Sequence, residues 1–193
     1  MQQFATNELV LIRHAPADHG GRLIGRTDVP ASMPGPDRMA RARGSVGACR
    51  RVFCSPARRC TMTAQALFPG LTCTADPRLW EQDFGQHEGM PATDLPDLGP
   101  LDRAALARLR NPGGESFADL ARRVAPAIKE IAAEAAAGPI AVVAHAGTIR
   151  AALSMALGRI EAGLAFDIAP LSATRLAWHG GDFAILATNH PLA

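Results

Sequence analysis

The chain has 193 residues, of which 48% are hydrophobic and 20% are charged, and its formal net charge is +2. This length and composition predict one globular domain, residues 1–193, with a core of its own. A net charge so close to zero argues against partners such as nucleic acid or a membrane surface.

The sequence shows no targeting feature. The N-terminal stretch MQQFATNELV has neither the basic region nor the long apolar region of a signal peptide, and no segment approaches the roughly 18 apolar residues of a membrane span. The four cysteines form no Cys-x-x-Cys pair and no zinc-ligand spacing. We therefore expect buried, reduced thiols in a cytoplasmic protein.

Short apolar runs alternate with helical patterns along the chain. The runs predict buried strands at residues 9–13, 52–55, 71–75 and 140–144. Helices are expected at 37–48, 56–67, 116–137 and 147–157. The third is the clearest, because apolar residues recur at helical spacing after Ser116 and Asp119, which can form a capping box.

The last part of the chain predicts a different element. LSATRLAW and FAILATN flank the turn sequence HGGD, which is typical of a β-hairpin that closes a sheet. Strands that alternate with helices predict the α/β class. Residues 15–37 and 90–100 are rich in Gly, Pro and Asp, and we expect these loops to form pocket walls or lids.

Chemically useful side chains follow three of the strands. The first strand ends at Arg13 and His14, the second runs through Ser55 into a helix with Arg58 in its first turn, and the fourth ends at His145. In open α/β sheets, ligands bind outside the carboxyl ends of the strands. We therefore expect two histidines and two arginines to meet at one edge of the sheet. Arginine suits phosphate, because its guanidinium forks around the anion.

Helix N-termini add to this site. The helix after His145 begins at Ala146 and Gly147, and its backbone N–H groups and positive dipole end favour an anion. We predict that both residues bind the phosphate of a small-molecule phosphate ester.

The residues present limit the chemistry. We find no carboxylate cluster and no His-x-x-x-His spacing for a metal ion, so we expect no metal and no cofactor. A cysteine phosphatase needs an arginine six residues after its thiol, where Cys54 is followed by Cys60. Histidine remains as the nucleophile, and the nearby arginines keep His14 neutral and able to attack phosphorus.

A leaving alcohol also needs a proton. The segment LWEQDFGQHEG offers Glu81 and Asp83 as candidate general acids, with Glu88 as a weaker third. The same carboxylate can later take a proton from the attacking water.

Five motifs resemble, in the same order, the histidine phosphatase (phosphoglycerate-mutase-like) superfamily: LVLIRHA, CSPARRCTMTA, LWEQDFGQHEG, GGESF and VVAHAGTIRAAL. The resemblance implies a three-layer α/β/α sandwich with a mostly parallel sheet. It also implies that His14 is phosphorylated, Arg13 and Arg58 bind phosphate, Glu81 is the acid and base, and His145 completes the pocket. Arg59 is then interpreted as a solvated neighbour of Arg58.

The chain departs from the family pattern at a few positions. Ala15 and Ala146 stand where glycine is usual, and His87 stands where many members have tryptophan. RHAPAD and GRLIGRTDVP look most like the α-ribazole phosphatase branch of cobalamin biosynthesis. In that branch Gly25 and Arg26 would contact the non-phosphate part of the substrate, which implies α-ribazole 5′-phosphate or a related small ester.

Other members of the superfamily keep alternatives open. A phosphoglycerate mutase-type phosphotransferase would retain and re-deliver the phosphoryl group. A non-catalytic relative would bind phosphate with its arginines and would need neither the nucleophile nor the acid. The resemblance also allows a homodimer.

Overall fold

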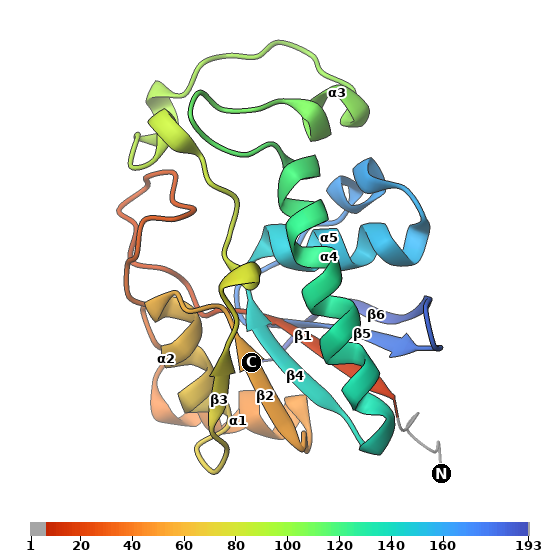
Figure 1. The fold of residues 1–193 in the computed structure, drawn as a ribbon. Helices are drawn as coiled ribbons and strands as arrows, with labels where there is room; N and C mark the ends of the chain where they lie inside the picture. The colour runs from red at the N-terminus through yellow and green to blue at the C-terminus, as the bar shows by residue number, and fades with distance from the viewer. Residues whose placement is uncertain (1–6, 193) are drawn as a thin grey trace.

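A six-stranded sheet forms the centre of the computed structural model, which describes residues 7–192 (Figure 1). The strand order is β3-β2-β4-β1-β5-β6, in which the β3-β2, β2-β4 and β4-β1 pairs are parallel and the last two are antiparallel. The strands are β1 Glu8–Arg13, β2 Arg51–Cys54, β3 Cys73–Ala75, β4 Ile140–Ala144, β5 Ser172–Trp178 and β6 Phe183–Pro191. The predicted α/β class and the mostly parallel sheet are confirmed.

Helices cover both faces of the sheet (Figure 1). The α-helices are α1 Pro36–Val46, α2 Arg58–Leu67, α3 Arg103–Arg108, α4 Phe117–Ala133 and α5 Ala146–Leu157. Short 3-10 helices are η1 Pro77–Leu79, η2 Gly85–His87, η3 Ala92–Asp94, η4 Glu134–Ala137 and η5 Ile160–Ala165.

Because side chains alternate along each strand, the hydrophobic core has two halves, one on each face of the sheet. In β1, Leu9 and Leu11 pack in the cluster that includes α4 and α5, whereas Val10 and Ile12 pack in the cluster that includes α1 and α2. Successive side chains of a strand point to opposite faces, so a strand buried on both faces is apolar throughout. This arrangement gives the three layers that the family resemblance implies.

Most predicted elements are present, with local differences. Ser116 and Asp119 form both bonds of the expected capping box at the start of α4. The third strand begins at Cys73 instead of residue 71, because the N–H of Leu71 bonds the carbonyl of Phe68 in the turn after α2 and its side chain is exposed. Helix α3 lies in a stretch where no helix was expected.

Three neighbouring strands end at the same level. Arg13 of β1 is paired with Ala144 of β4, and Cys54 of β2 is paired with Val143 of β4. The residues that follow these strands therefore emerge side by side at one edge of the sheet. That residues 1–193 form a single domain stays a prediction.

Candidate active site

A cavity of about 250 Å³ lies at this edge of the sheet. It is lined by Arg13, His14, Pro16, Ala17, His19, Arg22, Leu23, Ile24, Arg59, Glu81, His145 and Pro170. Backbone hydrogen bonds fix the base of this cavity. The N–H of His14 donates to the carbonyl of Ala144, and the N–H of Ser55 donates to the carbonyl of Val143, each at a distance of 3.0 Å. The structure thus brings together four of the five predicted catalytic residues.

His14 is buried and neutral. Its Nδ1 lies 2.6 Å from the carbonyl oxygen of Ala15. Because a carbonyl only accepts, Nδ1 carries the proton and Nε2 keeps a free lone pair. Burial lowers the pKa of His14 to about 3, and the charges of Arg59 and Arg13 act in the same direction. His14 is therefore held in the form that can attack phosphorus.

His145 lies beside His14 at the start of α5. The two rings meet edge to face, with 5.2 Å between their centroids, and the indole of Trp80 stacks parallel to His145 at 6.3 Å. His145 Nε2 is 2.9 Å from the hydroxyl oxygen of Ser55. Complete burial lowers the pKa of His145 well below its usual value, and His14 and the neighbouring arginines lower it further. A neutral His145 ring can form hydrogen bonds in the cavity without adding a positive charge to it.

Two guanidinium groups face the histidines. Arg13 donates from one terminal nitrogen to the carbonyl of Ile168, and burial lowers its pKa. Arg59 donates to the carbonyls of Thr27 and Gly25 over 3.0 and 2.7 Å. The Nε atoms of both arginines are buried and have no acceptor among residues 7–192. Such donors suit an anion bound between the two side chains.

The predicted role of Arg58 does not fit its position. Arg58 is exposed and does not line the cavity, and its backbone N–H bonds the carboxylate of Asp28 over 2.8 Å. Arg59 was interpreted as solvated, which is wrong, because it is only 1% exposed. One residue turns a helix by about 100°. The apolar residues Cys60, Ala64 and Leu67 have helical spacing and are buried on the face of α2 that also buries Arg59, so this spacing is the sequence signal that selects Arg59.

Glu81 is the carboxylate that lines the cavity. One of its oxygens accepts the N–H of Gln82 at a distance of 3.0 Å, and the other accepts the N–H of Gly147 at a distance of 3.2 Å. Asp83, the rival acid, instead accepts the N–H of Gly85 over 2.8 Å and does not line the cavity. A Cβ atom at Gly147 would lie 2.1 Å from a Glu81 oxygen, so glycine leaves room for this carboxylate.

Glu88 anchors a loop instead of serving as an acid. Its carboxylate accepts the N–H groups of Gly25, Arg26, Thr27 and Phe84, and also the hydroxyl of Thr27. Burial by itself would raise the pKa of Glu88, but these bonds together lower it. The bonds fix the segment whose carbonyls orient Arg59, so Glu88 was a functional residue that the motif alone did not reveal.

Arg123 holds the acid segment from the other side. On α4, its guanidinium donates to the carbonyls of Arg78, Trp80 and Glu81 and pairs with the carboxylate of Glu115 at 2.7 Å. No sequence motif assigned a role to Arg123, and a charged helix residue of this kind is usually solvated. Its side chain is instead mostly buried and positions Glu81.

The remaining predicted site residues lie outside the cavity. Gly25 contributes a carbonyl to Arg59, and Gly147 contributes an N–H group to Glu81. Ala146 is half-buried in the first turn of α5. The guanidinium of Arg26 lies 3.8 Å from Glu115 and over the ring of Trp80 at 5.7 Å. The Arg26 side chain therefore lies against Trp80 and Glu115, outside the catalytic cavity.

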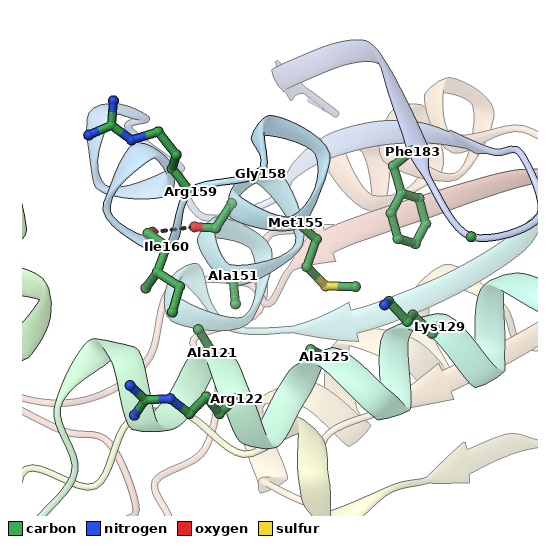
Figure 2. Close-up of a pocket in the computed structure, with 12 residues that line it drawn as sticks. Ala121, Arg122, Ala125, Lys129, Ala151, Met155, Gly158, Arg159, Ile160 and Phe183 are labelled. Carbon is green, nitrogen blue, oxygen red and sulfur yellow. Dashed lines mark hydrogen bonds between the residues drawn. The ribbon is translucent and has the colours of Figure 1, made fainter.

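A separate cavity of about 300 Å³ lies between α4, α5 and the β-hairpin (Figure 2). Ala121, Ala151, Met155 and Phe183 give it small and apolar walls. At its rim, Arg122 and Arg159 pair with Asp119 and Glu161. None of its lining residues belongs to the predicted catalytic set.

The described residues 7–192 contain no group of three or more His, Cys, Asp or Glu placed to hold a metal ion. Among those same residues, no helix has the length and apolar character needed to cross a bilayer. The four cysteines are all free, with Cys54 and Cys60 buried. The thiol of Cys60 lies 3.5 Å from Nε2 of His145 and is part of the packing behind that ring.

Comparison with known proteins assigns this chain to a family. The model of the histidine phosphatase superfamily (branch 1) matches residues 9–191. A glucosyl-3-phosphoglycerate phosphatase of Mycolicibacterium vanbaalenii is 34% identical over 167 residues, which are 78% of this chain and 74% of that protein.

Solved structures agree. A mycobacterial glucosyl-3-phosphoglycerate phosphatase in complex with inorganic phosphate has a TM-score of 0.81 and 26% identity, over 96% of this chain and 98% of that chain. The α-ribazole phosphatase of Shigella flexneri has a TM-score of 0.80 and 20% identity, over 94% and 96%, which shows a shared fold. This chain therefore belongs to branch 1 of the histidine phosphatase superfamily and is a phosphatase of that family.

Proposed function

We propose that this phosphatase is a metal-independent phosphomonoesterase that forms a phosphohistidine at His14. One observation carries the proposal: a neutral, buried His14, whose Nδ1 proton is held by the carbonyl of Ala15, lies in one cavity with Arg13, Arg59 and Glu81. The two guanidinium groups would supply the positive charge that the phosphoryl group needs as charge spreads over its oxygens.

The first step transfers the phosphoryl group to the protein. Nε2 of His14 attacks phosphorus while the bond between phosphorus and the alcohol oxygen breaks. Glu81, as a carboxylic acid, gives its proton to the leaving oxygen. Arg13 and Arg59 hold the phosphoryl oxygens, and His145 with Ser55 hydrogen-bonds an oxygen from the floor of the cavity. Arg59 thus takes the role that the sequence assigned to Arg58.

The second step releases phosphate. Water attacks the phosphohistidine, the bond between phosphorus and Nε2 breaks, and the Glu81 carboxylate takes the proton of the water. This returns Glu81 to its acid form and His14 to its neutral form. The half-buried and exposed residues along the outer wall of the cavity, among them His19 and Arg22, leave a path for water.

Two substrates are candidates. α-Ribazole 5′-phosphate is supported by the motifs around residues 13–30 and by the shared fold of an α-ribazole phosphatase. Glucosyl-3-phosphoglycerate is supported by a glucosyl-3-phosphoglycerate phosphatase that is 34% identical to this chain. A homodimer stays a prediction.

Steady-state phosphate release tests the proposal. The kcat/KM is measured with EDTA present for α-ribazole 5′-phosphate, glucosyl-3-phosphoglycerate, 3-phosphoglycerate and 4-nitrophenyl phosphate. We expect turnover that EDTA does not change and that is lost in the folded variant His14→Asn. Equal activity of His14→Asn, or loss of activity in EDTA, would refute the mechanism. A need for a bisphosphate primer would reveal a phosphotransferase, and binding without turnover would reveal a non-catalytic relative.

A further inference from the structure

An apolar cavity of about 360 Å³ adjoins the catalytic cavity. Leu23 lines both cavities, and Gln82 of the apolar cavity directly follows Glu81 of the catalytic cavity. The position of Leu23 is well determined, because its N–H donates to the carbonyl of Met90 and its carbonyl accepts the N–H of Gly89, each over 2.8 Å. A molecule whose phosphate lies between Arg13 and Arg59 therefore reaches this cavity by passing Leu23.

The wall of the second cavity is mostly hydrocarbon. Its apolar lining consists of Leu23, Phe84, Leu95, Pro96, Leu98, Leu106, Leu109, Phe117 and Leu164. Two of these side chains are unusually open to solvent, since Leu98 is 48% exposed and Leu106 is 41% exposed. Large apolar side chains gathered around a cavity beside a reaction centre are typical of a ligand site.

The polar side chains in this cavity have protein partners. Nδ1 of His87 lies 2.9 Å from the side-chain oxygen of Asn111, and the Gln82 amide donates to the carbonyl of Glu115 over 2.8 Å. Nε of Arg150 donates to the carbonyl of Phe166 over 2.9 Å. These bonds orient the polar side chains within the fold, and the apolar side chains form the larger part of the lining.

The catalytic cavity also has some apolar lining. Pro16, Ala17, Ile24 and Pro170 are among its lining residues. The exception at the rim is Arg22, which donates to the carbonyl of Gly89 over 2.7 Å, with His19 nearby in the same lining. The other N–H groups of Arg22 are donors that a carboxylate on the substrate would use, which the carboxylate ester below tests.

We infer that the preferred substrates are phosphomonoesters whose alcohol carries an apolar body, such as an aromatic ring, that lies in the cavity beyond Leu23. This inference rests on the proposed phosphomonoesterase function. Transfer of apolar surface from water into such a cavity supplies the discrimination. Of the two candidates named above, α-ribazole 5′-phosphate has an aromatic base, whereas glucosyl-3-phosphoglycerate has a sugar and a carboxylate.

Three matched esters test the inference: 3-phenylpropyl phosphate, 3-hydroxypropyl phosphate and 3-carboxypropyl phosphate. All three release a primary alcohol from the same three-carbon chain, so they differ mainly at the far end. We expect kcat/KM for the phenyl ester to exceed both others by at least about tenfold, the scale of discrimination that an apolar pocket gives.

Variants locate the effect. Leu98→Asn and Leu106→Asn place an amide in the cavity wall, and each should reduce the ratio of phenyl to hydroxyl kcat/KM by about fivefold or more. Leu101→Asn is the matched control, because Leu101 is 42% exposed, lies between the other two in the chain, and does not line the cavity. We expect Leu101→Asn to keep the ratio of the unmodified protein.

Each outcome is decisive. Hydrolysis of all three esters at similar kcat/KM would overturn the inference and leave the phosphatase function intact, and so would a preference for the carboxylate ester, which would assign Arg22 to a second anion. A phenyl preference that Leu98→Asn and Leu106→Asn leave unchanged would overturn the assignment of this cavity. No hydrolysis of these three esters, with turnover of the substrates tested for the proposed function, would overturn the inference alone; no turnover of either set would overturn the proposed function, and the inference with it.

Discussion

Arg58 and Arg59 are neighbours in the chain but lie in different environments. Arg58 is exposed on α2, whereas Arg59 is buried under the loop that contains Gly25 and Thr27 and faces His14 across the cavity. A motif match of one arginine too early therefore selects a side chain on the wrong side of the helix. Only the period of the buried positions along α2 distinguishes the two.

Replacement of each arginine by alanine separates their roles. We expect Arg59→Ala to lower kcat/KM by about 10²-fold or more, because it removes a charged donor to the phosphoryl oxygens. Arg58→Ala should change kcat/KM by less than about twofold, since surface side chains away from a site contribute little. Phosphate-release kinetics check both. A larger loss in Arg58→Ala than in Arg59→Ala would contradict the assignment.

A single methyl group at Gly147 tests the position of Glu81. The Cβ atom of Gly147→Ala would lie 2.1 Å from a Glu81 oxygen, at the end of a side chain that can move away. We expect kcat to fall at least about tenfold, because small displacements of a catalytic group are costly, while the protein stays folded. Gly44→Ala in α1 is the control, since nothing lies near its Cβ, and helix propensity predicts a gain of about 0.5–1 kcal/mol with unchanged kcat. Equal kcat in Gly147→Ala would refute the role of Glu81.

At the scale of elements, the regular parts and the place of residues 15–37 and 90–100 in the pocket walls were predictable, whereas the contacts of single loop residues were not. Leu9 to Ile12 and Ile140 to Ala144 are apolar throughout, so their strands and the residues that follow them could be predicted locally. Leu23 lies in an irregular loop, and its place beside the cavity depends on bonds to Gly89 and Met90, more than 60 residues away. No local pattern reports such a contact. The same reason explains why Glu88 was read as a weak acid candidate.

The Glu88 carboxylate accepts hydrogen bonds both from residues 25–27 and from Phe84, so its charge holds these two segments together. Glu88→Gln replaces one acceptor oxygen by an NH₂ group that faces backbone N–H donors, so we expect a loss of about 2 kcal/mol in the free energy of unfolding. Because the anchored carbonyls of Gly25 and Thr27 orient Arg59, kcat/KM should fall as well. Urea unfolding and phosphate release measure the two effects. Glu130→Gln, at an exposed ion pair, is the control and should change neither; if Glu88→Gln behaves like it, Glu88 is no anchor.

At the scale of the whole molecule, the two buried histidines couple stability to pH. The pKa of His14 is about 3 in the folded protein, against roughly 6.5 in an unfolded chain. Below pH 6.5 the unfolded chain therefore binds a proton that the native protein does not. The free energy of unfolding must then decrease as pH falls from about 6.5 toward 3, and burial of His145 acts in the same direction.

His14→Asn isolates one of these protons. Between pH 6.5 and 5, we expect the variant to lose less stability per pH unit than the unmodified protein, by at most about 1.4 kcal/mol per unit. Urea unfolding at several pH values gives both slopes. Identical slopes would mean that His14 has the same pKa in the folded and unfolded protein, contrary to the lowered pKa of the buried ring.

The three-layer order and the shared level of the strand ends were predictable, because they follow from apolar strands that alternate with helices. The inferred preference for an apolar substrate was not, because it rests on residues 15–30 and 90–110, which are mostly irregular and whose leucines gather only in the folded chain. Under that inferred preference, specificity is a property of the loops, and the sheet holds the reaction centre.

A burst experiment with Glu81→Gln tests whether phosphohistidine forms at His14. 4-Nitrophenol leaves without a proton, so the first step should remain fast in this variant, whereas water attack, which needs the carboxylate, should be slow. We predict a burst of about one equivalent of 4-nitrophenolate and, after quenching in base, a phosphoryl group that mass spectrometry locates on His14. A phosphoryl group on another residue, or full turnover by His14→Asn, would contradict the account.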